Sequence, residues 1–283
     1  MPDAIMEHDA GTFRLSLADL ADPRDVRHTL QETSYLGRLV APDIDVRALE
    51  RAFDAAARLH TGNYADFPAG PDGFRRLETA CATTLAAMRL MHGAHVMGRG
   101  FAPRDILLLA LAALFHDPGD GHGGPDVGNP TFARDHLTMD GFSRADAEDC
   151  AALIRCARPE WTPGHADMAP DSIPEDDMDM AGCLLATAVI LAEITDRRRF
   201  EQISFLCLRT GDTRQAEQAL NAIGRTAVRR LHRGLGSVHT LMLPHFGNRW
   251  GLDRDLYMET ARETREMLAA TLERVESDST ALS

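Results

Sequence analysis

Along most of the chain, apolar residues recur at intervals of three and four, the spacing that places them on one face of an α-helix. In the first sixty residues this spacing predicts two or three amphipathic helices. No stretch alternates apolar and polar residues in the way that predicts a half-buried strand. The pattern therefore indicates an all-α fold, a multi-helix bundle of about eight to ten helices. Further helices are expected at 74–92, 104–116, 143–157, 181–210, 213–235 and 253–276.

Two segments rich in glycine and proline interrupt the helical pattern. Residues 61–73 are expected to form a loop, and residues 118–130, with five glycines and three prolines, leave no room for a regular element. We therefore expect an N-terminal helical extension over residues 1–60 and a larger helical domain over residues 61–283, together one compact unit. The extension carries no recognisable chemistry, and two roles stay open for it: capping the core or forming a homodimer.

The helix expected at 104–116 differs from the others because it is apolar on nearly every face. Its longest apolar run, Ile106 to Phe115, has ten residues, about half of what a helix needs to cross a bilayer. This run is therefore expected inside a protein core, and the chain is expected to be soluble, without a membrane partner.

The net charge of −13 and the pI of about 5.3 argue against a nucleic-acid polymer or an anionic membrane surface as a partner. All 30 basic residues are arginine, because the sequence contains no lysine. A Walker-type phosphate loop, pyridoxal-phosphate chemistry and Schiff-base chemistry each need a lysine. The composition therefore excludes these three classes.

The five cysteines form no Cys-x-x-Cys pair, and several lie within apolar helical stretches. Free cysteine in such a stretch behaves as a small buried hydrophobic residue. The first residues, which include Glu7 and Asp9, lack the basic and apolar regions of a signal peptide. Together these features favour a reducing, cytoplasmic location.

The most informative motif is the end of the apolar helix, where His116 and Asp117 are followed by Pro118 and Gly119. An imidazole nitrogen and a carboxylate oxygen are ligands for zinc, manganese, iron or magnesium-like ions, and they can converge on one cation where Pro-Gly ends the helix. The alternative interpretation is a histidine that interacts favourably with the helix dipole, followed by an ordinary turn aspartate. The doublet alone leaves both interpretations open.

This motif resembles the signature of the HD superfamily of metal-dependent phosphohydrolases, which includes the cyclic-nucleotide phosphodiesterases. The resemblance covers residues 74–210 approximately, and its specific motif is four residues long. It implies an all-α HD-domain-like bundle that holds one or two divalent ions of zinc, manganese, iron or magnesium. It further implies hydrolysis of a phosphate ester or diester by a metal-bound hydroxide, with a small phosphorylated molecule such as a nucleotide as substrate.

Carried over residue by residue, the resemblance assigns His116 and Asp117 as metal ligands and Asp196 as the aspartate that closes the site. His136 stands where many family members carry a ligand for a second metal. Asp196 has a rival interpretation, a helix-end carboxylate that pairs with the arginines at 197–199, and Glu193 on the same helical face is a possible substitute.

The family's first histidine has no direct counterpart. The position at the family's spacing on the helix 74–92 is Cys81, which either binds the metal as a thiolate or fills the core. His92 and His95 are alternatives, but they lie at the far end of that helix. A second hypothesis follows, a catalytically degenerate HD fold kept as a binding or regulatory scaffold. Family members often carry a basic residue directly after the motif, whereas this chain has Asp120. This difference also favours the second hypothesis.

The remaining candidates concern catalysis and substrate binding. The glycine-rich loop after the doublet matches Gly-x-Gly-x-x-Gly, but it follows a helix instead of a strand, so a dinucleotide site is not expected. Within it, His122 is a candidate to act with Asp117 in catalysis. Guanidinium groups offer bidentate contacts to phosphate. The candidates for that role are Arg134, Arg197 and Arg198.

Overall fold

The structure of the chain, a computed structural model, describes residues 15–20, 22–63, 73–117, 129–156, 177–227, 231, 235 and 237–281. Within these residues every regular element is a helix, which confirms the predicted all-α fold. The helices are α1, Leu17–Leu20; α2, Val26–Val40; α3, Val46–His60; α4, Gly73–Val96; α5, Pro103–Phe115; α6, Asn129–Met139; α7, Arg144–Cys156; α8, Asp177–Ile194; α9, Arg197–Thr210; α10, Arg214–Asn221; α11, Met242–Trp250; and α12, Leu256–Ala281, with a π-helical turn at Ala222–Ala227 and a 3-10 turn at Val238–Leu241.

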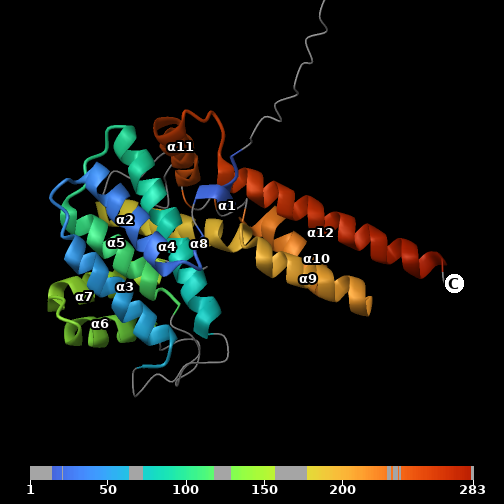
Figure 1. Cartoon of the computed structure of the whole chain (residues 1–283), viewed down its shortest axis with the longest axis horizontal. Helices are drawn as coiled ribbons and strands as arrows, with labels where there is room; N and C mark the ends of the chain where they lie inside the picture. The colour runs from blue at the N-terminus through green and yellow to red at the C-terminus, as the bar shows by residue number, and fades with distance from the viewer. Residues whose placement is uncertain are drawn as a thin grey trace, which may run out of the picture.

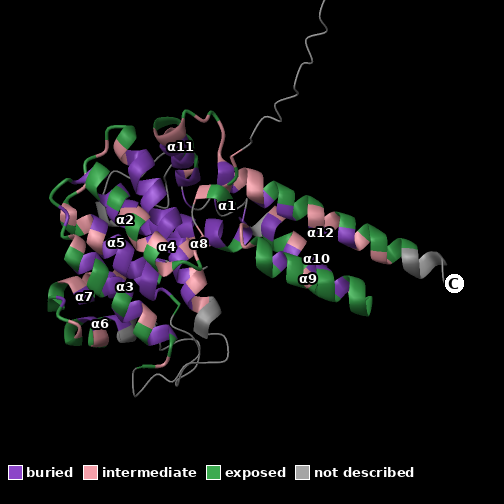
Figure 2. Cartoon of the chain, in the orientation of Figure 1, coloured by how far each residue is buried: buried purple, intermediate pink, exposed green. Residues whose placement is uncertain are grey.

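Helix α4 lies at the centre of the body, and α2, α5, α8 and α11 pack around it (Figure 1). Burial is concentrated on α4, α5 and α8, as Figure 2 shows. At Gly93 of α4 the neighbouring backbone approaches so closely that an added Cβ would lie 1.8 Å from the carbonyl oxygen of Leu241. This contact lets the 3-10 turn and α11 pack directly on the central helix.

Helices α2 and α3 contribute to the same hydrophobic core as the later helices. Leu36, Leu49 and Phe53 are almost fully buried in it. Each helix begins at an aspartate N-cap, Asp25 or Asp45, whose carboxylate accepts the backbone N–H three residues on. Residues 26–60 are therefore built into the body that α4 and α5 occupy.

Helices α9, α10 and α12 project from this body as an arm (Figure 1). Helix α12 packs along α9 and α10, and the arm carries more exposed residues than the body (Figure 2). Gly211, in the left-handed conformation at φ +71°, ends α9. Three apolar residues of α9 are strongly exposed: Phe205, Leu206 and Leu208.

The helices predicted at 74–92, 104–116, 143–157 and 253–276 are all present with shifted ends. The single helix predicted over 181–210 is instead two, because the chain breaks between α8 and α9. Helices α6 and α11 were not predicted, since both are short; α6 begins at Asn129, within the segment 118–130 that was expected to hold no regular element, and α11 contains Pro244. No described helix combines the length and the apolar character that a membrane-spanning helix requires.

Candidate functional site

The His-Asp doublet lies at the end of α5, whose last turn is packed in the core. His116 ends the helix, and its side chain is buried. Because a carbonyl can only accept, His116 Nδ1–H donates to the Ala113 carbonyl oxygen, 2.8 Å away. Burial lowers the pKa of His116, and the Ala113 carbonyl and the Asp117 carboxylate raise it by less. The ring is therefore neutral near pH 7, with its lone pair on Nε2.

Asp117 lies in the opposite environment, with its side chain 51% exposed. Arg76, near the start of α4, donates from Nη1 to Asp117 Oδ1 at 3.3 Å. An exposed pair of this kind contributes about 1 kcal/mol at most to stability. The doublet therefore places an imidazole inside the body and a carboxylate at its surface, with a guanidinium beside the carboxylate.

A second histidine, His60, lies next to the doublet. Its side chain is 3% exposed, and among the described residues no group makes a hydrogen bond of good geometry with either ring nitrogen, although the Leu114 backbone lies near the ring. Burial lowers the pKa of His60 to about 4; the Leu114 backbone and Asp117 raise it, and the charges of His116 and Arg76 lower it further. The charges that act on the His60 pKa are thus those of the doublet and of Arg76. The C-terminal ends of α3 and α5 and the N-terminal part of α4 therefore meet here.

The position of His60 follows from the amphipathic pattern of α3. His60 is the last residue of that helix, and it lies on the same face as Phe53 and Ala56, which are buried against the core. Helix α3 packs against α5, so its last turn faces the end of α5. The sequence analysis did not identify His60, although its place on the apolar stripe of its helix was a usable signal.

Cys81 lies on α4 and is fully buried. Burial raises the pKa of the Cys81 thiol to about 12, although Thr29 lowers it. The group is therefore a thiol at neutral pH, whereas a metal ligand needs the thiolate. This environment matches the core-filler interpretation of Cys81.

Asp196 lies between α8 and α9, and its carboxylate caps α9 by accepting the Arg199 N–H at 3.0 Å. Its predicted role as the closing metal ligand would compete with this cap. Glu193, the substitute, lies one turn earlier on α8.

The three arginines predicted to bind phosphate lie on two separate elements. Figure 1 places α6 in the body and α9 in the arm, and Arg198 at the start of α9 reaches Glu78 of α4. Each guanidinium is exposed and already has a carboxylate partner. The pairs are Arg134 with Asp135, Arg197 with Glu201, and Arg198 with Glu78.

The two remaining predicted residues are His136 and His122. His136 lies on α6, half-buried, one turn from its C-terminal end. His122 lies outside the described residues. Within the part of the chain that the structure describes, no three His, Cys, Asp or Glu side chains converge closely enough to hold a metal ion without movement.

An open groove of about 760 Å³ borders the other face of the last turn of α3. Arg58 donates to Asp140 across it at 2.5 Å, and Arg51 stacks on the ring of Phe142 at 5.6 Å. The groove thus places further guanidinium groups near the helix end that carries His60. It is lined by Arg51, Asp54, Ala57, Arg58, Thr61, Asn63, Met139, Asp140 and Gly141.

Comparison of the chain with protein-family models, with characterised proteins and with solved structures finds no match.

Proposed function

We propose that the chain is a metal-dependent phosphohydrolase or phosphodiesterase of HD type, with a divalent ion held by His60, His116 and Asp117. The observation that carries the proposal is His60. A buried imidazole without a well-formed hydrogen bond destabilises a fold, and this one lies beside the doublet that resembles the HD signature. It supplies the second imidazole, for which the sequence analysis offered Cys81, His92 and His95.

The three side chains suit a metal ion chemically. His60 and His116 are both neutral at pH 7, the state in which imidazole binds metals. His116 donates its Nδ1–H to a backbone carbonyl, as metal-binding histidines usually do, and this bond orients Nε2 for a ligand. Two imidazoles and one carboxylate form a donor set for zinc, manganese or iron. Asp117 would have to turn from Arg76 to complete it.

A bound metal would lower the pKa of its water toward neutrality and polarise a phosphoryl oxygen. The chain's own residues supply the rest. The apolar end of α5 keeps water from one side of the site. Arg76, released from Asp117, can bind two phosphoryl oxygens through its guanidinium. Asp196, His136, His122, Arg134, Arg197 and Arg198 stay predictions; each would need a rearrangement or residues outside the described part of the chain.

Metal analysis of protein purified without chelators tests the proposal. The wild type should contain about one zinc, manganese or iron ion per chain and hydrolyse bis(p-nitrophenyl) phosphate. His60→Ala and His116→Ala should lose both properties. His239→Asn is the matched control, since His239 is also buried and lies on the 3-10 turn that packs on α4 at Gly93, more than four turns along that helix from Arg76. Retained metal in His60→Ala would exclude the proposed ligand set.

A second candidate function is a degenerate HD-type fold that binds a ligand without catalysis. Two observations favour it: Asp117 already pairs with Arg76, and Asp196 already caps α9. In that case the doublet is a structural remnant. Wild-type protein that contains no metal, takes up none from added zinc or manganese and hydrolyses no phosphodiester would support this alternative against the enzyme.

A further inference from the structure

The second half of α4 carries an arginine in the core. Arg89 is 2% exposed, and its Nη1 donates to the hydroxyl of Tyr257 at 3.0 Å, with the guanidinium 5.8 Å from the centre of the same ring. Nε and Nη2 are both buried without a hydrogen-bond partner. Among the described residues, no carboxylate lies within ion-pair distance of this guanidinium. A buried cation without a counter-charge costs several kcal/mol.

The two unpartnered nitrogens share one edge of the guanidinium. This edge presents two parallel N–H groups, the geometry that binds a carboxylate or phosphate through two oxygens. At the surface of the same chain, Arg214 binds a carboxylate through this edge of its guanidinium. Arg214 donates from Nε to Asp212 Oδ1 at 3.0 Å and from Nη2 to Asp212 Oδ2 at 2.7 Å. On Arg89 the equivalent edge meets no acceptor.

Two buried histidines lie beside Arg89. His245 Nδ1 and His92 Nδ1 are 3.1 Å apart, so one ring donates to the other, and His245 Nε2 has no partner. Burial lowers the pKa of His245 to about 2, with Arg89, His92 and Arg249 lowering it further. Both rings are therefore neutral, and when His92 is the donor, His245 carries its own proton on Nε2. In that tautomer the Nε2 proton is a third unused donor in the cluster.

The nearby carboxylates are engaged elsewhere. Glu32 pairs with Arg249, whose Nη2 lies 3.5 Å from its Oε1. Asp255 caps α12 by accepting the backbone N–H of Tyr257 at 2.9 Å. Neither carboxylate lies within ion-pair distance of Arg89, and Arg249 adds a second positive charge to the same region. Among the described residues, the surroundings of Arg89 thus offer no carboxylate acceptor for its open edge.

We infer that Arg89, His92, His245 and Tyr257, here called the Arg89 cluster, form a binding site for a small oxyanion between α4, α11 and α12. The anion is a phosphate or carboxylate group held by Nε and Nη2 of Arg89, with His245 as the third donor. The site is separate from the proposed metal site, because Arg89 lies 13 residues along α4 from Arg76, about 20 Å at 1.5 Å per residue. It does not depend on the proposed function.

Thermal unfolding in the presence of added anions tests this inference. The melting temperature of the wild type should rise with inorganic phosphate and saturate as one site fills, relative to chloride at equal ionic strength. The same titration with acetate in place of phosphate shows whether the site prefers a carboxylate or a phosphate group, because the preferred anion should raise the melting temperature more. Arg89→Met should show only the weak, unsaturable rise that phosphate gives any protein by exclusion from its surface. Arg214→Met, the same change at the surface, should respond as the wild type does.

Arg89→Lys keeps the charge and removes the bidentate edge, so its response should fall at least severalfold below that of the wild type. If the enclosed site already holds its anion after purification, added phosphate has no free site to fill, and wild-type protein denatured in acid should instead release about one phosphate or carboxylate per chain, measured by ion chromatography. Equal responses of wild type and Arg89→Met, together with no anion released by the wild type, would overturn the inference. If Arg89→Met does not fold, the wild-type titration and the released anion decide.

Discussion

Asp255, the N-cap of the long helix α12, is a half-buried carboxylate whose charge should destabilise the protein. Its Oδ1 accepts the backbone N–H groups of Tyr257 at 2.9 Å and Met258 at 3.2 Å. Burial nevertheless raises the pKa of Asp255 to about 6, against the lowering effect of these two bonds and with a further rise from Glu259. Asp255→Asn removes the charge and keeps the accepting oxygen, and asparagine caps helices as well as aspartate does.

The magnitude follows from the change in pKa on folding. A rise from 3.8 to about 6 corresponds to about 3 kcal/mol of destabilisation at pH 7.5, since each unit is worth about 1.4 kcal/mol. The side chain is not fully enclosed, and losing the charge forgoes about 0.3–1 kcal/mol of interaction with the helix dipole. We therefore expect Asp255→Asn to stabilise the protein by about 1–2 kcal/mol at pH 7.5.

The pH dependence has a definite sign. Between pH 4 and pH 6 the folded state holds the Asp255 proton more tightly than the unfolded state, so the wild type loses stability as the pH rises through this range. Well below pH 3.8 both states are protonated, and the part of the difference from Asp255→Asn that comes from the change in pKa disappears. At pH 5 about half of the difference should remain.

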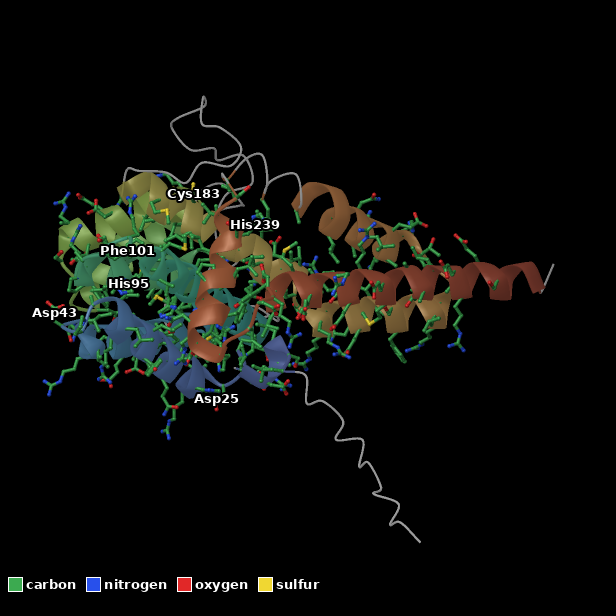
Figure 3. The ribbon with its side chains drawn as sticks, turned by 90° about the horizontal axis from the view of Figure 1, so that it is seen from above. Asp25, Asp43, His95, Phe101, Cys183 and His239 are labelled. Atoms are coloured by element: carbon green, nitrogen blue, oxygen red, sulfur yellow. The ribbon has the colours of Figure 1, made fainter. Side chains whose placement is uncertain are left out.

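Urea unfolding of the wild type and of two variants at pH 5 and pH 7.5 measures this effect. Asp25→Asn is the matched control, because Asp25 caps α2 in the same way but lies exposed at the surface, where Figure 3 labels it. The control should change the free energy of unfolding by less than about 0.5 kcal/mol. A destabilised Asp255→Asn at pH 7.5, or a gain independent of pH, would refute the reasoning.

Three further predictions follow from single residues. Gly93→Ala should destabilise the protein by about 3 kcal/mol or more in thermal unfolding, because the added Cβ would overlap the Leu241 carbonyl oxygen. Gly100→Ala, which has open space around it, is the control and should have a stability within about 0.5 kcal/mol of the wild type. Cys81 should resist iodoacetamide in the native protein at pH 8 and react only in urea, and Cys81→Ala should keep the wild-type metal content; loss of metal would restore Cys81 as a ligand. Arg76→Ala should change stability by less than about 1 kcal/mol yet raise KM for a phosphodiester severalfold; an unchanged KM would exclude its role in binding.

The fold class could be predicted from the sequence because the helical period is local information. The boundary at Asp196 could not, since apolar residues continue on both sides of it and only the capping contact to the Arg199 N–H reveals the break. Aspartate is a common N-cap, so a cap was the stronger interpretation of that residue than a metal ligand on spacing alone.

The candidate site was only half predictable. The doublet was visible as a local motif, but His60 lies 56 residues before His116, and only the packing of α3 on α5 brings the two together. The burial of Arg89 was equally hidden. A charged residue on an amphipathic helix is expected to face water, and here α11 and α12 cover it.

The central claim, that His60 joins His116 and Asp117 around a divalent ion, is tested most directly by a crystal structure of protein grown with manganese or zinc and recorded at the absorption edge of the metal. The account predicts one strong anomalous peak about 2.1 Å from a ring nitrogen of His60 and from Nε2 of His116, with the Asp117 carboxylate turned from Arg76 toward it. An anomalous peak elsewhere, or none while Asp117 stays paired with Arg76, would contradict the claim.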